Sequence, residues 1–217
     1  MRVIAIDGPA GSGKSTVARA LAERIGLRYL DTGAMYRAVA FAALRRGVDP
    51  ADEPLVAEIA RTFELSLHTD GTVFVDTVDA TIEIRGPEVT RAVSTVAANS
   101  IVREEMRERQ RRFAAKHHGA VMEGRDIGTV VFPDAELKVY LDAAPDVRAA
   151  RRSKEVTDLS YETVAADLAR RDALDQGRSD SPLVVADGAL VIDTTGLTVE
   201  QIIEHVANAL EAGSTAS

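Results

Sequence analysis

The chain of 217 residues contains no cysteine. Disulfide scaffolds, thiol nucleophiles and cysteine-based zinc sites are therefore excluded, and the composition fits a reducing compartment, so we expect a cytoplasmic protein. A chain of this length can bury an apolar core large enough to fold without covalent cross-links.

Long apolar runs and a surplus of positive charge are also missing. No run is long enough to cross a bilayer, and residues 1–7 lack the features of a signal peptide, so we expect no leader and no membrane partner. The formal net charge of −8 disfavours binding to a nucleic acid polymer. Any phosphate ligand must then be held by local cations.

A glycine-rich pattern near the amino terminus supplies such a cation. Residues 2–7 form an apolar run typical of a buried parallel strand, and residues 14–25 carry apolar side chains at helical spacing. Between them, residues 8–15 match G-x-x-x-x-G-K-[ST], a loop whose backbone N–H groups surround phosphate. We expect Lys14 to reach the β- and γ-phosphates of ATP and Ser15 to hold Mg²⁺. The expected nucleotide contacts are Gly8, Pro9, Ala10, Gly11, Ser12, Gly13, Lys14, Ser15 and Thr16.

Further apolar runs alternate with helical stretches and predict an α/β fold around a parallel sheet. Residues 198–212 predict a terminal amphipathic helix with Thr198 and Gln201 as a capping box. Two arginine-rich stretches, 99–116 and 145–155, are also predicted helices. The remaining predicted strands of the sheet are 28–30, 120–123, 137–142 and 189–193.

The region 64–84 interrupts this alternation. Three short strand-like pieces, 65–68, 73–76 and 81–84, surround an Asp70-Gly71 turn signal and predict an inserted antiparallel hairpin region. The chain has no N-K-x-D guanine-binding motif, so a regulatory GTPase is disfavoured, and its small size favours a kinase for a small acceptor.

Three further motifs make the sequence recognisable. They are DTGAMYR at 31–37, EGRDIGTVVFPD at 123–134, and R-D-x-x-D-x-x-R at 171–178 ahead of Pro182-Leu183. Through them the chain resembles bacterial cytidylate kinases, members of the P-loop nucleoside monophosphate kinase family, over essentially its whole length. The resemblance implies transfer of the γ-phosphoryl group of ATP to CMP or dCMP. A kinase for another nucleoside monophosphate, UMP first, and a non-catalytic ATP-dependent sensor are the alternatives.

The resemblance also implies an architecture. A five-stranded parallel sheet flanked by helices would form a core from residues 1–34, 110–147 and 159–213. Residues 35–109 would be an acceptor-binding insertion containing a small antiparallel sheet, and residues 148–158 a short lid. We expect residues 214–217 to be a disordered tail and the protein to be a monomer.

Acceptor-binding residues are carried over from the family motifs. Arg37, Arg125 and Arg178 would hold the acceptor phosphate, since a guanidinium pairs bidentately with phosphate oxygens. The cytosine base would be read by Ser94, Arg103 and Asp126, because a carboxylate accepts from its amino group and an arginine satisfies its acceptors. The alternative for Arg103 is a solvated helix face shared with Arg107, Arg109, Arg111 and Arg112.

Arg171 and Asp175 resemble the sugar contacts of the family, although their spacing of four fits an ordinary helical ion pair equally well. Thr32, Tyr36 and Gly124 complete the expected acceptor contacts, and Tyr36 at the edge of a core is the alternative for that residue. All three lie within the family motifs.

The expected catalytic groups are Lys14, Arg125 and lid arginines. Of Arg148, Arg151 and Arg152, we expect Arg148 or Arg152 to contact the transferring phosphoryl, and not all three. Glu123 stands where other family members have Asp, and its carboxylate could orient metal-bound water. The four histidines match no catalytic pattern.

Overall fold

The computed structural model describes residues 1–68, 70–155 and 159–214. The chain divides into two compact units, one formed by Met1–Tyr29 with His117–Ser217 and the other by Leu30–Lys116. The expected lid extends into residues 156–158 and the expected tail into residues 215–217, which lie outside the described residues. Within those described ranges, no helix has the length and apolar character needed to cross a membrane.

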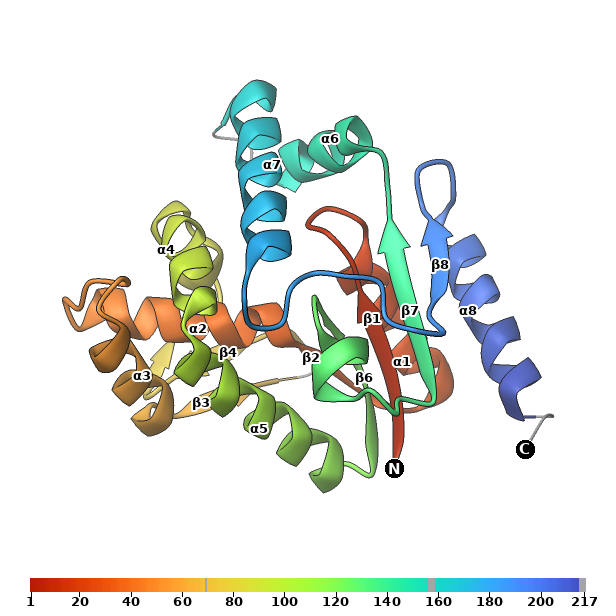
Figure 1. The fold of residues 1–217 in the computed structure, drawn as a ribbon, viewed down its shortest axis with the longest axis horizontal. Coiled ribbons are helices and arrows are strands. Elements are labelled where there is room, and N and C mark those ends of the chain that lie inside the picture. Colours follow the sequence, from red (N-terminus) through yellow and green to blue (C-terminus); the bar gives the residue numbers. More distant parts are fainter. Residues whose placement is uncertain (69, 156–158, 215–217) are drawn as a thin grey trace. The chain divides into compact units, whose positions relative to one another are not determined.

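A five-stranded sheet organises the first unit (Figure 1). Strand β1 pairs in parallel with β6 on one side and β7 on the other, and β7 pairs in parallel with β8. The predicted parallel sheet is confirmed. Its order is β2 (Arg28–Asp31), β6 (Gly119–Gly124), β1 (Arg2–Asp7), β7 (Leu137–Asp142) and β8 (Leu190–Asp193).

Two helices pack against this sheet and form the main core of the unit. Helices α1 (Lys14–Ile25) and α8 (Val199–Ser214) contribute buried side chains such as Leu21 and Val206, which contact Ile4 and Ile6 of β1. The predicted capping box is confirmed, because Thr198 N–H donates to Gln201 Oε1 at 2.9 Å and Gln201 N–H donates to Thr198 Oγ1 at 3.3 Å. Both predicted helices are therefore present.

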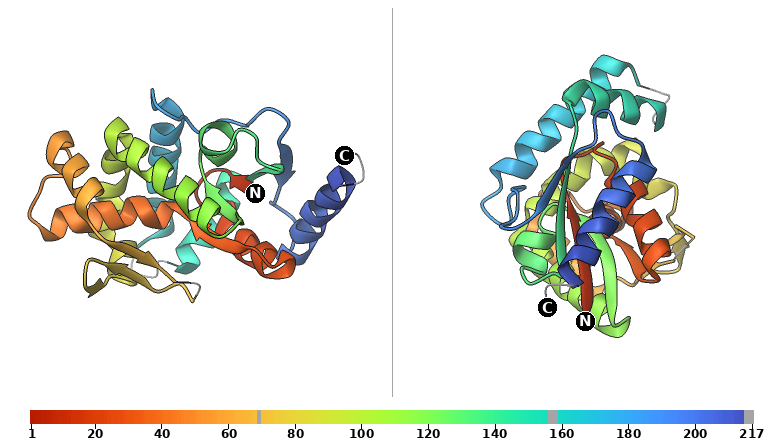
Figure 2. Two further views of the ribbon diagram at one scale, coloured as in Figure 1. Left: turned by 90° about the horizontal axis from the view of Figure 1, so that it is seen from below. Right: turned by 90° about the vertical axis from the view of Figure 1, so that its right-hand side faces the viewer.

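The carboxyl ends of β6 and β7 lead into the remaining helices of the first unit. A short π-helix, η2 (Ile127–Val131), follows β6, and α6 (Pro145–Glu155) follows β7. Helix α7 (Tyr161–Gly177) packs against α6, and the right-hand view of Figure 2 shows the two helices together. The predicted helix at 145–155 is confirmed, and α7 is the element that carries the R-D-x-x-D motif.

The second unit is a helical cluster with a small sheet. Helix α2 (Thr32–Arg45) packs against α3 (Glu53–Thr62), α4 (Pro87–Ala98) and α5 (Ser100–Lys116). Strands β3 (Leu65–Leu67), β4 (Val73–Val75) and β5 (Val78–Asp79) form an antiparallel sheet in that order. The expected insertion sheet and the arginine-rich helix near 99–116 are thus confirmed.

One predicted strand is wrong. Residues 81–84 are not a strand; the third strand is β5, and the chain then enters the 3-10 helix η1 (Glu83–Arg85). The cause is an Asx turn, in which the Asp79 carboxylate accepts from Thr81 N–H at 3.0 Å and from the Thr81 hydroxyl at 2.5 Å. This turn ends the strand and redirects the chain.

Gly119 allows a test of the close backbone contact between the start of β6 and β1. Its φ is +147°, and a Cβ there would lie 2.3 Å from the Arg2 carbonyl oxygen. We expect Gly119→Ala to lower the free energy of unfolding by about 3 kcal/mol or more, because backbone strain and a backbone clash add together. Urea denaturation measures the change. The control is Gly26→Ala, where φ is +69° but nothing lies within 4 Å, so the expected loss is about 1 kcal/mol. Equal losses would contradict the clash.

Candidate active site

The residues of the phosphate-loop pattern form a loop between β1 and α1, and the side chain of its lysine hydrogen-bonds back to the loop. Lys14 begins α1 and is 6% exposed, and its Nζ donates to the Pro9 carbonyl oxygen at 2.6 Å. The Ser12 hydroxyl is buried and has no hydrogen-bond partner among the described residues. A buried hydroxyl and an ammonium on one glycine-rich loop fit a phosphate ligand.

Oxygen groups suited to a magnesium ion meet beside this loop. The Ser15 hydroxyl donates to Glu123 Oε2 at 2.9 Å, and the Tyr29 hydroxyl donates to Glu123 Oε1. Hydroxyl and carboxylate oxygens are the ligands and water-orienting groups that Mg²⁺ prefers. The residues therefore fit the ion. Tyr29 was missed by the sequence reasoning, since nothing in its spacing links it to position 123.

The pKa of Lys14 is shifted by burial and by several charged side chains around it. Burial first, and the Arg125 guanidinium second, lower its pKa from 10.5 to about 7, while Glu123 and Asp7 act in the opposite direction. The pKa of the lysine is thus set by a balance of buried cations and carboxylates. An anionic phosphate bound at the loop would shift this balance toward the protonated lysine.

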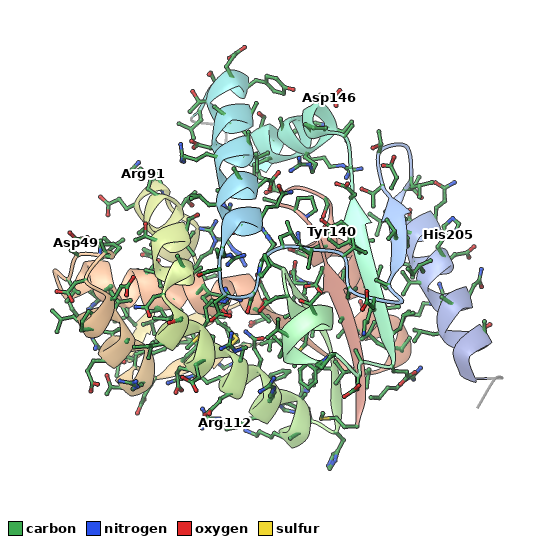
Figure 3. The ribbon with its side chains drawn as sticks, in the orientation of Figure 1. Asp49, Arg91, Arg112, Tyr140, Asp146 and His205 are labelled. Carbon is green, nitrogen blue, oxygen red and sulfur yellow. The ribbon has the colours of Figure 1, made fainter. Side chains whose placement is uncertain are left out.

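Asp7, at the end of β1, anchors the segment that follows β6. Its two carboxylate oxygens accept from the N–H groups of Ile127 at 2.9 Å and Gly128 at 2.7 Å. Burial raises the pKa of Asp7 to about 6, although these hydrogen bonds oppose the shift. Tyr140, its neighbour in β7 (Figure 3), also has a raised pKa through burial and the Asp142 carboxylate. A carboxylate at the carboxyl end of a central parallel strand was the sequence signal that could have found Asp7.

Three of the expected acceptor residues form one cluster in the same unit. Arg125 follows Gly124 at the end of β6, and its Nε donates to Asp175 Oδ2 at 2.8 Å. Arg178, just beyond α7, lies 3.2 Å from Asp175 Oδ1. Burial alone would raise the pKa of Asp175, but the two guanidinium groups hold it below its usual range. The Asp175 carboxylate therefore compensates the charge of two arginines, one of which, Arg125, is 50 positions away in the sequence.

Arg171 lies in the same electrostatic field. Burial first, and Arg125 second, lower its pKa to about 10, whereas Asp175 acts in the opposite direction. In the described part of the chain, the ion pairs of Asp175 are with Arg125 and Arg178. The simple helical pair between Arg171 and Asp175, one of the two readings of their spacing, is not what the structure shows.

The second unit holds five of the expected acceptor residues: Thr32, Tyr36, Arg37, Ser94 and Arg103. Arg37 on α2 donates from Nη1 to the Ile84 carbonyl at 3.0 Å and to the Thr90 hydroxyl at 2.9 Å. Ser94 is half-buried on α4, one turn beyond Thr90, so the two share a helix face. Thr32 is buried at the start of α2, where the Asp31 carboxylate caps the helix by accepting from Ala34 N–H.

Arg103 is not part of a solvated face. It is 1% exposed, donates to the Ala97 carbonyl at 3.2 Å, and places its guanidinium carbon 5.4 Å from the centre of the Tyr36 ring. Arg109 is also engaged, with its guanidinium carbon 4.8 Å from the centre of the Phe63 ring. Only Arg111 and Arg112 of the five helix arginines are exposed. Arg103 and Tyr36 are thus brought together, while Asp126 is buried in the first unit.

The three α6 arginines differ in their surroundings. Arg148 is 8% exposed and donates to the carbonyls of Ala10 and Ala143, each at 3.1 Å, and to Asp172. Arg151 donates to the Thr194 hydroxyl at 2.9 Å and the Thr194 carbonyl at 2.7 Å.

Thr194 in turn lies against the phosphate loop, because its hydroxyl is 3.1 Å from the Ser12 carbonyl oxygen. Arg152 pairs with Glu155 at 2.6 Å near the exposed end of α6. Thr194 was missed by the sequence reasoning.

Comparison with known proteins identifies the relationship behind these motifs. A model of the Cytidylate kinase family matches residues 4–212. The chain belongs to the cytidylate kinase family. Relatives named cytidylate kinase include those of Corynebacterium glutamicum, 46% identical over 99% of this chain and 96% of the relative, and Bacillus subtilis, 47% identical over 97% of each. The relative from Pelotomaculum thermopropionicum is 47% identical over 97% of this chain and 96% of its own. Membership of the family confirms the resemblance read from the motifs.

Solved structures share the fold at much lower identity. A shikimate kinase from Bacteroides thetaiotaomicron is 12% identical with a TM-score of 0.51, over 97% of this chain and 98% of that chain. An uncharacterised protein from Eubacterium ventriosum is 13% identical with a TM-score of 0.52, over 97% and 99%. At such identities the likeness concerns the fold alone.

Lys14 gives the ligand-free protein a pH-dependent stability. Since its pKa falls from 10.5 in the unfolded chain to about 7 in the folded one, the unfolded chain binds more protons between these values. Its contribution to the free energy of unfolding therefore rises with pH across that window, by up to about 1.4 kcal/mol per pH unit. We expect Lys14→Met to flatten the slope between about pH 7 and about pH 9, measured by urea denaturation. Lys116→Met, at an exposed position, is the control; an unchanged slope in Lys14→Met would contradict the buried lysine.

Proposed function

We propose that the protein transfers the γ-phosphoryl group of ATP to CMP or dCMP, giving ADP and CDP or dCDP. The observation that carries the proposal is the charge coupling inside the first unit. Arg125 and Arg171, expected acceptor residues, act directly on the pKa of Lys14, the expected donor residue. A donor lysine and acceptor arginines within electrostatic reach of one another suit a reaction between two phosphates. The family membership supports the same acceptor.

The donor phosphates would bind at the phosphate loop. The backbone N–H groups of residues 8–16 and the Lys14 ammonium provide the positive environment, and the Ser12 hydroxyl is available as a further buried donor. Mg²⁺, when bound, would be held through the Ser15 hydroxyl and would neutralise charge on the β- and γ-phosphates. Glu123, hydrogen-bonded to Ser15, would orient water around the ion.

The acceptor phosphate would be held by Arg37, Arg125 and Arg178. An oxygen of that phosphate forms a bond to the γ-phosphorus while the bond from this phosphorus to the bridging oxygen of ADP breaks, so no covalent enzyme intermediate and no strong base are needed. Arg152 is proposed to contact the transferring group, and its pairing with the exposed side chain of Glu155 supports this choice. The buried contacts of Arg148 support a different role for that residue.

The base and sugar would be recognised by the remaining expected acceptor residues. Ser94, Arg103 and Asp126 offer the acceptor and donor groups that match cytosine, and uracil would leave some of them unpaired. Arg171 and Asp175 are proposed for the sugar, with Thr32, Tyr36 and Gly124 as further acceptor contacts. The burial of Arg103 supports recognition by a fixed side chain.

Acceptor turnover tests the proposal and its rivals together. ADP release is measured with ATP, Mg²⁺ and each of CMP, dCMP, UMP, AMP and dTMP. We expect fast turnover with CMP and dCMP, and Arg178→Ala should raise the KM for CMP at least tenfold because a charged phosphate contact is lost. Arg170→Ala, an exposed arginine on α7, is the control. Preference for UMP would favour the other kinase, and the absence of acceptor-dependent ADP formation would favour the sensor.

Ser94 tests the assignment of the base. Ser94→Ala removes one hydroxyl from a half-buried position, so we expect the ratio of kcat/KM for CMP over UMP to fall about tenfold, with the KM for ATP changing less than threefold. Thr95→Ala removes a hydroxyl from the next, exposed position of α4 and should leave the ratio unchanged. A fall of the same size in both variants would remove Ser94 from the base contacts.

The setting of the reaction is also a proposal. We infer a cytoplasmic monomer that acts on free nucleotides and not on a nucleic acid polymer, in keeping with the absence of cysteine and the net charge of −8. Light scattering on the full chain measures the oligomeric state, and a mass of twice 23.2 kDa would overturn the monomer.

A further inference from the structure

The guanidinium group of Arg148 makes its hydrogen bonds to buried groups of the protein. Its Nε donates to Ala143 at the end of β7, and its Nη1 donates to the carbonyl of Ala10 in the phosphate loop and to the Asp172 carboxylate of α7. The side chains of Arg148 and Asp172 are 10% and 12% exposed. One arginine thus joins the phosphate loop, the start of α6 and the middle of α7.

The backbone of α6 also lies close to the phosphate loop. A Cβ on Gly11 would be 2.9 Å from the Arg148 carbonyl oxygen and 3.1 Å from its Cβ, so only glycine lets the two chains approach this closely. Beside this contact, Ala10 of the loop packs with Ala149 of α6 and with Val164 and Leu168 of α7 in a small buried cluster. The loop, α6 and α7 therefore share both a polar and an apolar contact.

Helix α7 continues from this contact into the acceptor residues. Asp172 is preceded by Arg171, and Asp175 follows about 4.5 Å further along the helix axis. Asp175 then binds Arg125 and Arg178. A short series of contacts therefore begins at the phosphate loop, passes through the ion pair of Arg148 with Asp172, and ends at the arginines assigned to the acceptor phosphate.

We propose that Arg148 and Asp172 are positioning residues, whose ion pair holds α7 and its acceptor-binding side chains in register with the phosphate loop. The proposal rests on the proposed function for the assignment of the donor and acceptor sites, whereas the contacts of the ion pair are independent of that function. Arg148 then acts through Asp172 and the Ala10 carbonyl and does not touch the transferring phosphoryl, a role left to Arg152.

The physical reason lies in how a buried ion pair behaves. Such a pair contributes little net stability compared with apolar groups, but removing one partner leaves the other charge buried and uncompensated. Asp172 already has one oxygen, Oδ1, buried without a hydrogen-bond partner in the described structure. Asp172→Asn keeps the shape and removes the charge, so Arg148 loses its counter-ion and the register of α7 on the loop is no longer fixed.

Amide hydrogen exchange on the full, ligand-free chain tests this directly. In Asp172→Asn we expect exchange in residues 168–177 to rise at least tenfold and exchange in the loop, residues 8–15, to rise severalfold, with β1 and β6 unchanged. The matched control is Asp167→Asn, which removes the half-buried aspartate of a pair with the exposed Arg170 on the same helix, where Arg170 Nη1 lies 2.9 Å from Asp167 Oδ1. Exchange in the loop equal to that of the control would overturn the proposal, as would a uniform rise over the whole unit.

Steady-state kinetics separates positioning from general weakening. For Asp172→Asn we expect the KM for CMP to rise and kcat to fall, each at least tenfold, while the KM for ATP changes less than threefold because the loop amides and Lys14 remain. Equal effects on both KM values would overturn the proposal. A wild-type enzyme that does not phosphorylate CMP would instead remove the proposed function, and hydrogen exchange would still decide the role of the pair.

Discussion

Buried positive charge is the constraint on which the first unit depends. Lys14 is buried, and the half-buried Arg125 and Arg171 lie close enough for each to lower the pKa of the lysine. Such a group of cations folds only when carboxylates compensate it, and Glu123 and Asp175 are placed to do so. The same surplus of fixed positive charge is what phosphate ligands need. Stability and function therefore make opposite demands on one set of residues.

The parallel sheet was predictable from sequence because its strands are buried on both faces and read as continuous apolar runs. Helices α1 and α8 were predictable for a similar reason, since apolar spacing and a cap agreed. The third strand of the insertion was not, because Thr81–Ile84 alternates like a strand while the Asp79 side chain has already turned the chain. A side-chain hydrogen bond that overrides a pattern leaves no periodicity to detect.

Sequence reasoning named most candidate site residues but few of their partners. The motifs supplied Arg125, Asp175 and Arg178, yet the ion pair between Arg125 and Asp175 joins segments 50 positions apart. Spacing alone suggested Arg171 as the partner of Asp175, because helical neighbours are the only contacts that spacing can reveal. Asp7, Tyr29 and Thr194 were missed for the same reason: each acts through a contact made only when distant strands pair.

The case of Arg148 shows how burial separates roles that a motif leaves together. Three arginines within five residues of α6 looked equivalent, yet one is enclosed, one holds Thr194 and one lies near the exposed end of the helix. A guanidinium already saturated by two carbonyls and a carboxylate would have to break all three contacts to reach a moving phosphate. Each broken contact leaves a buried group unsatisfied, so the cost falls on the loop and on α7 at once. An arginine with an exposed partner has no such cost, and for this reason we propose Arg152 for the phosphoryl contact and Arg148 for positioning.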